Sequence, residues 1–220
     1  MEIKWFGHAW FGVDVDGVRL IFDPLPEKYQ KKLGPSVDLE LARKADVILI
    51  SHSHTDHWGR DIIRSLRKPG TAVISPRKPA NKIGEDVKVV EAGQGVEFGQ
   101  VSVLAVPAYN MRKIYHRRGK GVGYLVTVGG KTIYHAGDTD HIPEMSNFGK
   151  VDVAFLPIGG KYTMDVNDAA LAAKAISPRV VIPMHNMTTK PAELARILGD
   201  VPGLRIEPME PGQTLSLTDL

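Results

Sequence analysis

The sequence contains no cysteine and no long apolar run. Without cysteine there is neither a disulfide framework nor a thiolate metal site, so any bound metal must have nitrogen and oxygen ligands. No segment approaches the roughly 18 to 20 consecutive apolar residues that span a bilayer. The N-terminal stretch MEIKWFGHAW lacks the charged-then-apolar layout of a signal peptide. We therefore expect a cytoplasmic protein without a membrane span.

Acidic residues are missing from one long stretch of the chain. None occurs between Glu97 and Asp138, whereas six basic residues do, so the formal net charge of +3 hides a local basic excess: Arg112, Lys113, Arg117, Arg118, Lys120 and Lys131. One interpretation is a solvated basic face. The other is a surface that attracts an anionic substrate.

The 220 residues, 43% of them hydrophobic, suffice for a sizeable core. Short segments rich in β-branched residues and bounded by Gly, Pro or Asp predict strands over 17–24, 45–52, 71–76, 87–92, 101–108, 121–128, 131–138, 151–158 and 179–185. Apolar residues at helical spacing predict helices over 36–45, 60–68, 166–176 and 191–199.

A weak internal repeat relates the two halves of the chain. GVRLIFDP and ADVILISH in the first half correspond to KTIYHAGD and VDVAFLPI in the second, each pair separated by a variable stretch. Two such halves predict an α/β (α+β) fold in which two sheets pack face to face with helices outside. With no evident linker, we expect a single domain over residues 1–220, built from two similar halves.

The densest group of polar residues follows one of the predicted strands. After the apolar run ADVILI, the segment SHSHTDHWGR places His52, His54, Asp56 and His57 within six positions. His52 and His54 are two residues apart, so in an extended backbone their imidazoles point to the same side. Neutral imidazoles and a carboxylate suit zinc, manganese, iron or nickel. A bound cation would explain why groups that repel one another when protonated are crowded together.

His-x-His-x-Asp-His after an apolar strand resembles the metal-binding motif of the metallo-β-lactamase superfamily. Other landmarks of that superfamily occur in order: a hairpin ending in Asp23 (LIFDP), Asp138 in YHAGDTD and His185 in VIPMHN. The resemblance implies a four-layer αβ/βα sandwich. GHAWFGVDVDG and GDTDHIPEM most resemble the predicted metal-dependent hydrolase branch, which includes ascorbate-6-phosphate lactonases and relatives of the phospholipase D that acts on N-acyl phosphatidylethanolamine.

The resemblance also implies roles for these residues. His52 and His54 would bind a first metal, Asp56, His57 and His185 a second, and Asp138 would bridge the two. The metals, zinc first among the candidates and one or two in number, would share a water and lower its pKa to give a hydroxide nucleophile. Asp56 would also act in catalysis by orienting or deprotonating that nucleophile.

One position departs from the pattern of the superfamily. Many members have a third histidine for the first metal where this chain has Asn110, whose amide oxygen is a poorer zinc ligand. His116 is the candidate replacement, with substrate contact or a surface position as alternatives. Tyr162 and Asn110 are further candidates for substrate binding, and the roles of His8 and His141 stay open between packing and the site.

These observations favour a metal-dependent hydrolase that uses a metal-bound hydroxide on an ester, lactone or phosphodiester of a small anionic substrate. A nuclease or cyclic-nucleotide phosphodiesterase is the second enzymatic hypothesis, because of the basic stretch, although only Tyr109 and Tyr115 lie nearby as stacking platforms. A non-catalytic metal-binding protein is the third. Nucleic acid is not a favoured partner. The oligomeric state is left open, and a homo-oligomer is one of the options.

Overall fold

The computed structural model describes residues 1–33, 44–84 and 86–220. The chain divides into two compact units, the first formed by residues 1–91 and 210–220 and the second by residues 92–209. Each unit contains one mixed sheet with helices, which confirms the predicted fold class. In the described part of the chain, no helix has the length and apolar character needed to cross a membrane.

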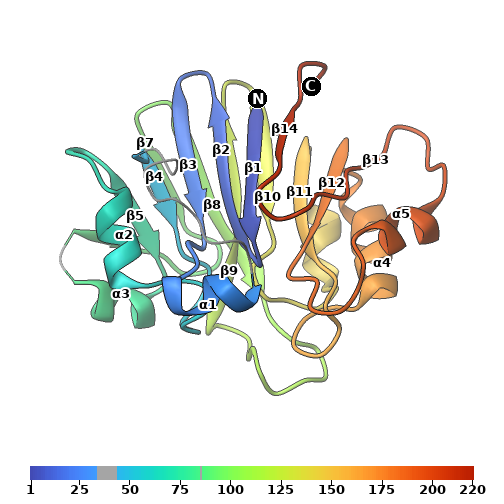
Figure 1. Cartoon of the computed structure of the whole chain (residues 1–220), viewed down its shortest axis with the longest axis horizontal. Coiled ribbons are helices and arrows are strands. Elements are labelled where there is room, and N and C mark those ends of the chain that lie inside the picture. The colour runs from blue at the N-terminus through green and yellow to red at the C-terminus, as the bar shows by residue number, and fades with distance from the viewer. Residues whose placement is uncertain (34–43, 85) are drawn as a thin grey trace. The chain divides into compact units, whose positions relative to one another are not determined.

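The sheet of the first unit has seven strands in the order β14-β1-β2-β3-β4-β5-β6. The strands β14, β1, β2 and β3 are antiparallel, and β3 to β6 are parallel. Figure 1 shows the C-terminal strand β14 beside β1. The strands are β1 (Glu2–Gly7), β2 (Trp10–Val15), β3 (Val18–Phe22), β4 (Val47–Leu49), β5 (Ala72–Ser75), β6 (Val87–Val89) and β14 (Thr214–Ser216).

Local sequence explains the main elements of this unit. The β2–β3 hairpin turns at Asp16–Gly17, where both residues have the positive φ of a two-residue hairpin turn. β3 and β4 are buried at every position, as expected for parallel strands covered on both faces. Helix α2 (Arg60–Leu66) packs its buried face, which includes Ile62, against the core of the sheet. The remaining helices are α1 (Glu27–Leu33) and α3 (Arg77–Ile83).

The sheet of the second unit also has seven strands, in the order β13-β12-β11-β10-β9-β8-β7. The strands β7 to β10 are antiparallel and β10 to β13 are parallel. The strands are β7 (Gly95–Phe98), β8 (Val101–Ala108), β9 (Gly121–Val128), β10 (Lys131–His135), β11 (Val153–Pro157), β12 (Val180–Met184) and β13 (Arg205–Ile206). The helices are the 3-10 helix η1 (Pro143–Asn147), α4 (Val166–Ile176) and α5 (Ala192–Leu198).

The two sheets have the same plan, as the internal repeat predicts. In each, an antiparallel part changes to a parallel part at one strand, β3 in the first unit and β10 in the second. These are the strands that begin the two corresponding sequence segments. Since the carboxyl ends of parallel strands meet at one edge of a sheet, each unit has one edge at which polar side chains can gather.

All nine predicted strand segments contain a strand, and three of the four predicted helices are present as α2, α4 and α5. The fourth, over 36–45, lies almost entirely outside the described residues. The elements that were not predicted are the strands β1, β2, β7, β13 and β14, the helices α1 and α3, and the 3-10 helix η1.

Candidate functional site

The loop after β4 brings the predicted metal-binding residues of the first unit together. His52 is buried and His54 is exposed, and their rings meet edge to face with His52 Nε2 3.1 Å from His54 Nδ1. Two nitrogens bound to one tetrahedral zinc ion, each about 2.0–2.1 Å from it, lie about 3.3 Å apart. The spacing of the two ring nitrogens therefore fits two ligands of one metal ion.

Asp23 supports this loop from the end of the neighbouring strand β3. The residue is buried and adopts a positive φ of 42°, a conformation that Asp tolerates better than most residues. Its carboxylate accepts hydrogen bonds from the Ser51 amide at 2.7 Å, from the Ser51 hydroxyl at 2.5 Å and from His57 Nδ1 at 2.7 Å. One carboxylate thus accepts hydrogen bonds from both ends of the segment Ser51–His57.

The hydrogen bonds to Asp23 also determine which ring nitrogens carry protons. A carboxylate only accepts, so His57 donates through Nδ1, and the Ser51 hydroxyl gives its single proton to Asp23. The Ser51 oxygen, 2.9 Å from His52 Nδ1, then accepts from that ring. In both His52 and His57, Nε2 is therefore the nitrogen that can bind a metal, the arrangement that supporting carboxylates commonly impose on metal ligands.

His8 lies beside Asp56. Its Nε2 is 3.3 Å from Asp56 Oδ2, and the ligand atoms of His8, Asp56 and His57 all lie within 4.8 Å of one another. His8 has a positive φ of 54°, and Trp5 Nε1 donates to its carbonyl oxygen at 3.1 Å. The backbone at His8 is thus held in a rarely used conformation that directs the imidazole toward Asp56.

In the second unit, Asp138 lies between two histidines. Its Oδ2 is 3.1 Å from His116 Nε2 and 3.4 Å from His185 Nε2. All three side chains are buried. Asp138 follows β10, and His185 follows β12 with a positive φ of 45°. The structure therefore joins three of the residues singled out in the sequence, His116 included, around one carboxylate oxygen.

Asn110 does not direct its amide toward this carboxylate. Its side-chain oxygen accepts from the His116 amide at 2.9 Å, and its side-chain nitrogen donates to Asp140 at 3.0 Å and to the Tyr162 carbonyl at 2.9 Å. The same Tyr162 carbonyl lies 3.1 Å from His116 Nδ1. A carbonyl only accepts, so Nδ1 of His116 carries a proton, and in the neutral ring the lone pair lies on Nε2, which faces Asp138.

The ligand atoms of His116 and Asp138 have the chemistry of a cation site. A neutral imidazole nitrogen and a carboxylate oxygen 3.1 Å apart are both electron-rich, and a shared cation or proton removes their repulsion. Tyr162 contributes its carbonyl, whereas its ring packs edge to face on Tyr115. Asn110 and Tyr162 thus position His116.

The basic stretch is partly neutralised within the second unit. Lys113 is 2.6 Å from Asp140, and Arg118 is 2.6 Å from Glu144. Arg112, Arg117 and Lys120 are exposed. Tyr109 donates to Glu144; burial and this carboxylate raise the pKa of its hydroxyl, and the Arg118 guanidinium acts in the opposite direction. His141 lines a second-unit pocket of about 460 Å³ together with Asp140 and Asp168.

Three features of the site were not assigned a role from the sequence. Asp23 was noted only as a landmark, His8 was left open, and Gly159 was not considered. A Cβ atom at Gly159 would lie 2.5 Å from the His185 carbonyl oxygen and 2.8 Å from Met187 Cγ. Only glycine lets the segment after β11 approach the His185 loop this closely.

Comparison with known proteins identifies the chain at family level. A family model for the β-lactamase superfamily domain matches residues 2–185. The chain belongs to the metallo-β-lactamase superfamily. A UPF0173 metal-dependent hydrolase of Thermococcus kodakarensis is 34% identical over 232 aligned positions, which cover 99% of this chain and 100% of the relative. Another, from Carboxydothermus hydrogenoformans, is 35% identical over 233 positions, with the same coverage of both chains.

Solved structures agree with this placement in the superfamily. A protein of Parabacteroides distasonis superposes with a TM-score of 0.86 at 34% identity, covering 96% of this chain and 93% of that one. A metallo hydrolase of the hyperthermophilic archaeon Ignicoccus hospitalis gives a TM-score of 0.77 at 29% identity, with 97% of each chain covered. The metallo-β-lactamase resemblance and the predicted fold are thus confirmed, and the chain is a metal-dependent hydrolase.

Proposed function

We propose that the protein hydrolyses an ester, lactone or phosphodiester bond in a small anionic substrate. The observation that carries this proposal is the proton arrangement on the buried histidines. His52, His57 and His116 each have Nδ1 held by an oxygen acceptor, so each presents Nε2 as a ligand. Such an arrangement suits metal binding, because it directs the other ring nitrogen of each histidine to a ligand position.

The proposed ligand sets combine the resemblance with these contacts. His52, His54 and His116 would bind the first metal, Asp56, His57 and His185 the second, and Asp138 would bridge them. From the family resemblance we expect the two ligand sets to form one dinuclear centre, within one domain over residues 1–220. His116 takes the place of the missing third histidine in this assignment, and the nitrogen and oxygen ligands suit zinc, manganese, iron or nickel.

A metal bound there would supply a water of lowered pKa as the nucleophile and a positive charge for the developing oxyanion. The chain's own residues prepare this reaction. Asp56 would accept a proton from the nucleophile, and His8 Nε2 lies 3.3 Å from its carboxylate. Asp23 keeps His52 and His57 in the required proton state.

An anionic substrate is supported by the exposed cations of the second unit. Arg112, Arg117 and Lys120 extend from the loop that carries His116. The nuclease hypothesis loses one of its two stacking platforms, because Tyr109 is buried, donates to Glu144 and lies under the Arg118 guanidinium at 4.8 Å. A small substrate therefore agrees better with the loop than a polynucleotide does.

Metal content and hydrolysis, measured on the same preparations, test the proposal. Elemental analysis of protein purified without a histidine tag should give close to two metal ions per chain, falling to one in His116→Ala. The metal-loaded protein should hydrolyse one of three probe classes: 4-nitrophenyl esters, aromatic lactones or bis(4-nitrophenyl) phosphate. Folded Asp56→Ala protein should lose this activity. Full activity in that variant, or after removal of all metal by a chelator, would refute the proposal.

A further inference from the structure

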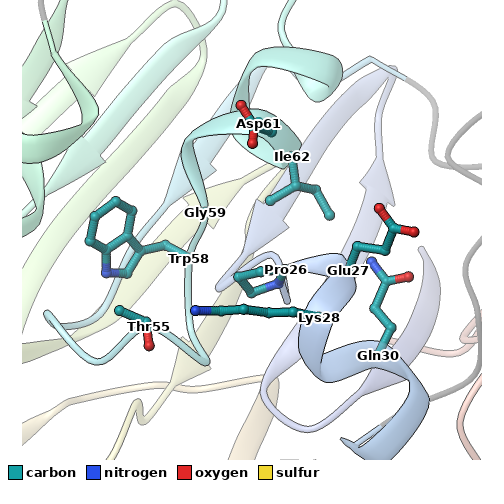
Figure 2. Close-up of a pocket in the computed structure, with 9 residues that line it drawn as sticks. All are labelled: Pro26, Glu27, Lys28, Gln30, Thr55, Trp58, Gly59, Asp61 and Ile62. Carbon is teal, nitrogen blue, oxygen red and sulfur yellow. The ribbon is translucent and has the colours of Figure 1, made fainter.

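A pocket in the first unit lies next to the metal-binding loop along the chain. Thr55 and Trp58 line it, and they flank Asp56 and His57 directly in sequence. The two middle residues of this four-residue segment belong to the proposed metal site. The two outer residues line the pocket, as Figure 2 shows. A group bound in the pocket would therefore contact the sequence neighbours of Asp56 and His57, two residues of the proposed metal site.

The wall of the pocket is largely apolar. Pro26, Trp58, Gly59 and Ile62 form its apolar part, Gln30 and Thr55 add uncharged polar groups, and the volume of about 470 Å³ lies within the range of small-molecule sites. A Cβ atom at Gly59 would lie 3.0 Å from Pro26 Cγ, so the glycine allows the loop and the segment before α1 to approach each other. Tyr29 and Thr55, whose hydroxyl oxygens are 2.9 Å apart, join α1 to the same loop.

Charged residues occur only at the rim and have mixed signs. Glu27 and Asp61 are acidic and Lys28 is basic, and all three are exposed. Figure 2 shows the side chain of Lys28 extending across the pocket between Pro26 and Thr55. Because the rim has no net positive charge, it offers little attraction to an anion, and the apolar wall penalises a buried charge. The pocket therefore suits an uncharged group.

Trp58 provides a polar feature inside this wall. The side chain is only 7% exposed, and its Nε1 is buried with no hydrogen-bond partner in the described part of the chain. In Figure 2 the nitrogen edge of the indole is turned to the side on which Thr55 lies. A buried N–H without an acceptor is unfavourable, and a carbonyl oxygen on a bound group would offset that cost.

We propose that this pocket binds the acyl part of the substrate, an uncharged chain or ring, with Trp58 Nε1 as donor to an acceptor oxygen other than the carbonyl under attack. The inference rests on the proposed function and narrows it, because it selects an ester or lactone over a phosphodiester. The anionic part of the substrate would then be a separate group. The enzyme should accordingly discriminate acyl chains by length, which a metal site alone does not do.

Two matched variants test the discrimination. Ile62 lines the pocket, whereas its neighbour Ile63 is buried in the core and does not line it. We expect the wild type to prefer 4-nitrophenyl hexanoate to the acetate by at least about tenfold in kcat/KM. Ile62→Ala should shift the optimum to a longer chain, and Ile63→Ala should leave the optimum unchanged. A flat chain-length profile, or the same shift in both variants, would overturn the inference.

A binding measurement without catalysis separates the two proposals. The three tryptophans, labelled with 5-fluorotryptophan, give three fluorine signals, and Trp58→Phe assigns one of them. Hexanamide, an uncharged acyl probe, should shift the Trp58 signal saturably, whereas acetamide and the buried Trp5 and Trp10 signals serve as controls. A Trp58 response without metal-dependent hydrolysis of any of the three probe classes would support the pocket and reject the proposed function. Metal-dependent esterase activity with a silent Trp58 would do the reverse.

Discussion

The replacement of Asp23 by Asn should weaken both the fold and the metal site. The Asp23 carboxylate is 1% exposed and accepts three hydrogen bonds, two from Ser51 and one from His57. An amide has the same shape but only one acceptor oxygen, and its NH₂ group would face at least one of these donors. The substitution thus removes a negative charge and places two donors against each other without creating a cavity.

The size of the effect follows from the number of contacts. A hydrogen bond to a charged group contributes about 1.5–3 kcal/mol, and losing one partner in a buried site exposes the full desolvation cost of the other. We expect Asp23→Asn to lower the free energy of unfolding of the metal-free protein by about 2–4 kcal/mol. A loss of this size lowers Tm by about 5–15 °C in a chain of this length.

Metal affinity should fall as well, because Asp23 sets the protons on two ligands. Removal of such a supporting carboxylate costs about 10- to 100-fold in metal affinity. Zinc affinity can be measured by competition with a chromophoric chelator, and stability by urea unfolding of the metal-free protein. Asp46→Asn is the matched control, because Asp46 also accepts a backbone hydrogen bond, from Arg19 at 2.8 Å, and precedes β4 instead of following it.

The reasoning fails if Asp23→Asn binds zinc as tightly as the wild type, since the proton positions on His52 and His57 would then not depend on Asp23. It also fails if Asp46→Asn lowers zinc affinity by the same factor. In that case the loss would reflect general destabilisation of the β3–β4 pair.

Three further outcomes are expected. Gly159→Ala should displace the His185 loop, lower stability by about 1–3 kcal/mol through overpacking and reduce metal content. Burial raises the pKa of Asp46, but hydrogen bonds from Lys68 and the Arg19 amide outweigh it and lower the pKa below 3.8. Asp46→Asn should therefore cost stability at pH 7, and the difference should vanish as the pH falls through the lowered pKa. Asn110→Ala should lose one metal ion per chain by elemental analysis.

Each of these outcomes has a specific control. Gly95→Ala is the control for Gly159, because a Cβ atom there would contact only the Val103 carbonyl oxygen, at 3.8 Å. Unfolding curves for the wild type and Asp46→Asn at several pH values show how their stability difference changes with pH. A difference that grows on acidification would contradict the lowered pKa of Asp46. If Asn110→Ala keeps both metal ions, the hydrogen bonds of Asn110 are not needed to place His116.

Much of the fold was predictable because its strands are short apolar runs with clear boundaries. The two missed α-helices lack that signal. Helix α3 (Arg77–Ile83) has Pro79 in its first turn and only Pro79 and Ala80 buried, so no apolar periodicity marks it. Helix α1 has the sequence EKYQKKL, in which only Tyr29 and Leu33 are apolar or aromatic. The packing of such helices is decided by neighbours far away in the sequence.

The candidate metal-binding residues could be named from spacing and resemblance, but the contacts that support them could not. Asp23 and Ser51 are 28 positions apart and meet because β3 and β4 pair in parallel, with Phe22 opposite Leu49. Asn110 was interpreted as a weak ligand in the place of a histidine. In the structure its side-chain oxygen instead accepts from the backbone amide of His116. This contact depends on how the loop between the two residues folds back. Contacts set by register and loop geometry leave no periodic trace in the sequence.

Asp23 and Asp138 occupy corresponding positions in the two sheets but make different contacts. Asp23 follows β3 and Asp138 follows β10, the strands at which each sheet changes from antiparallel to parallel. Asp23 contacts His57 through Nδ1, whereas Asp138 lies beside Nε2 of His116 and of His185. Since Nδ1 carries a proton in His57 and His116, the first carboxylate accepts a hydrogen bond from Nδ1, whereas the second faces Nε2, the metal-binding nitrogen of a neutral ring. The same position in the fold therefore supports proposed ligands in one unit and offers a candidate ligand in the other.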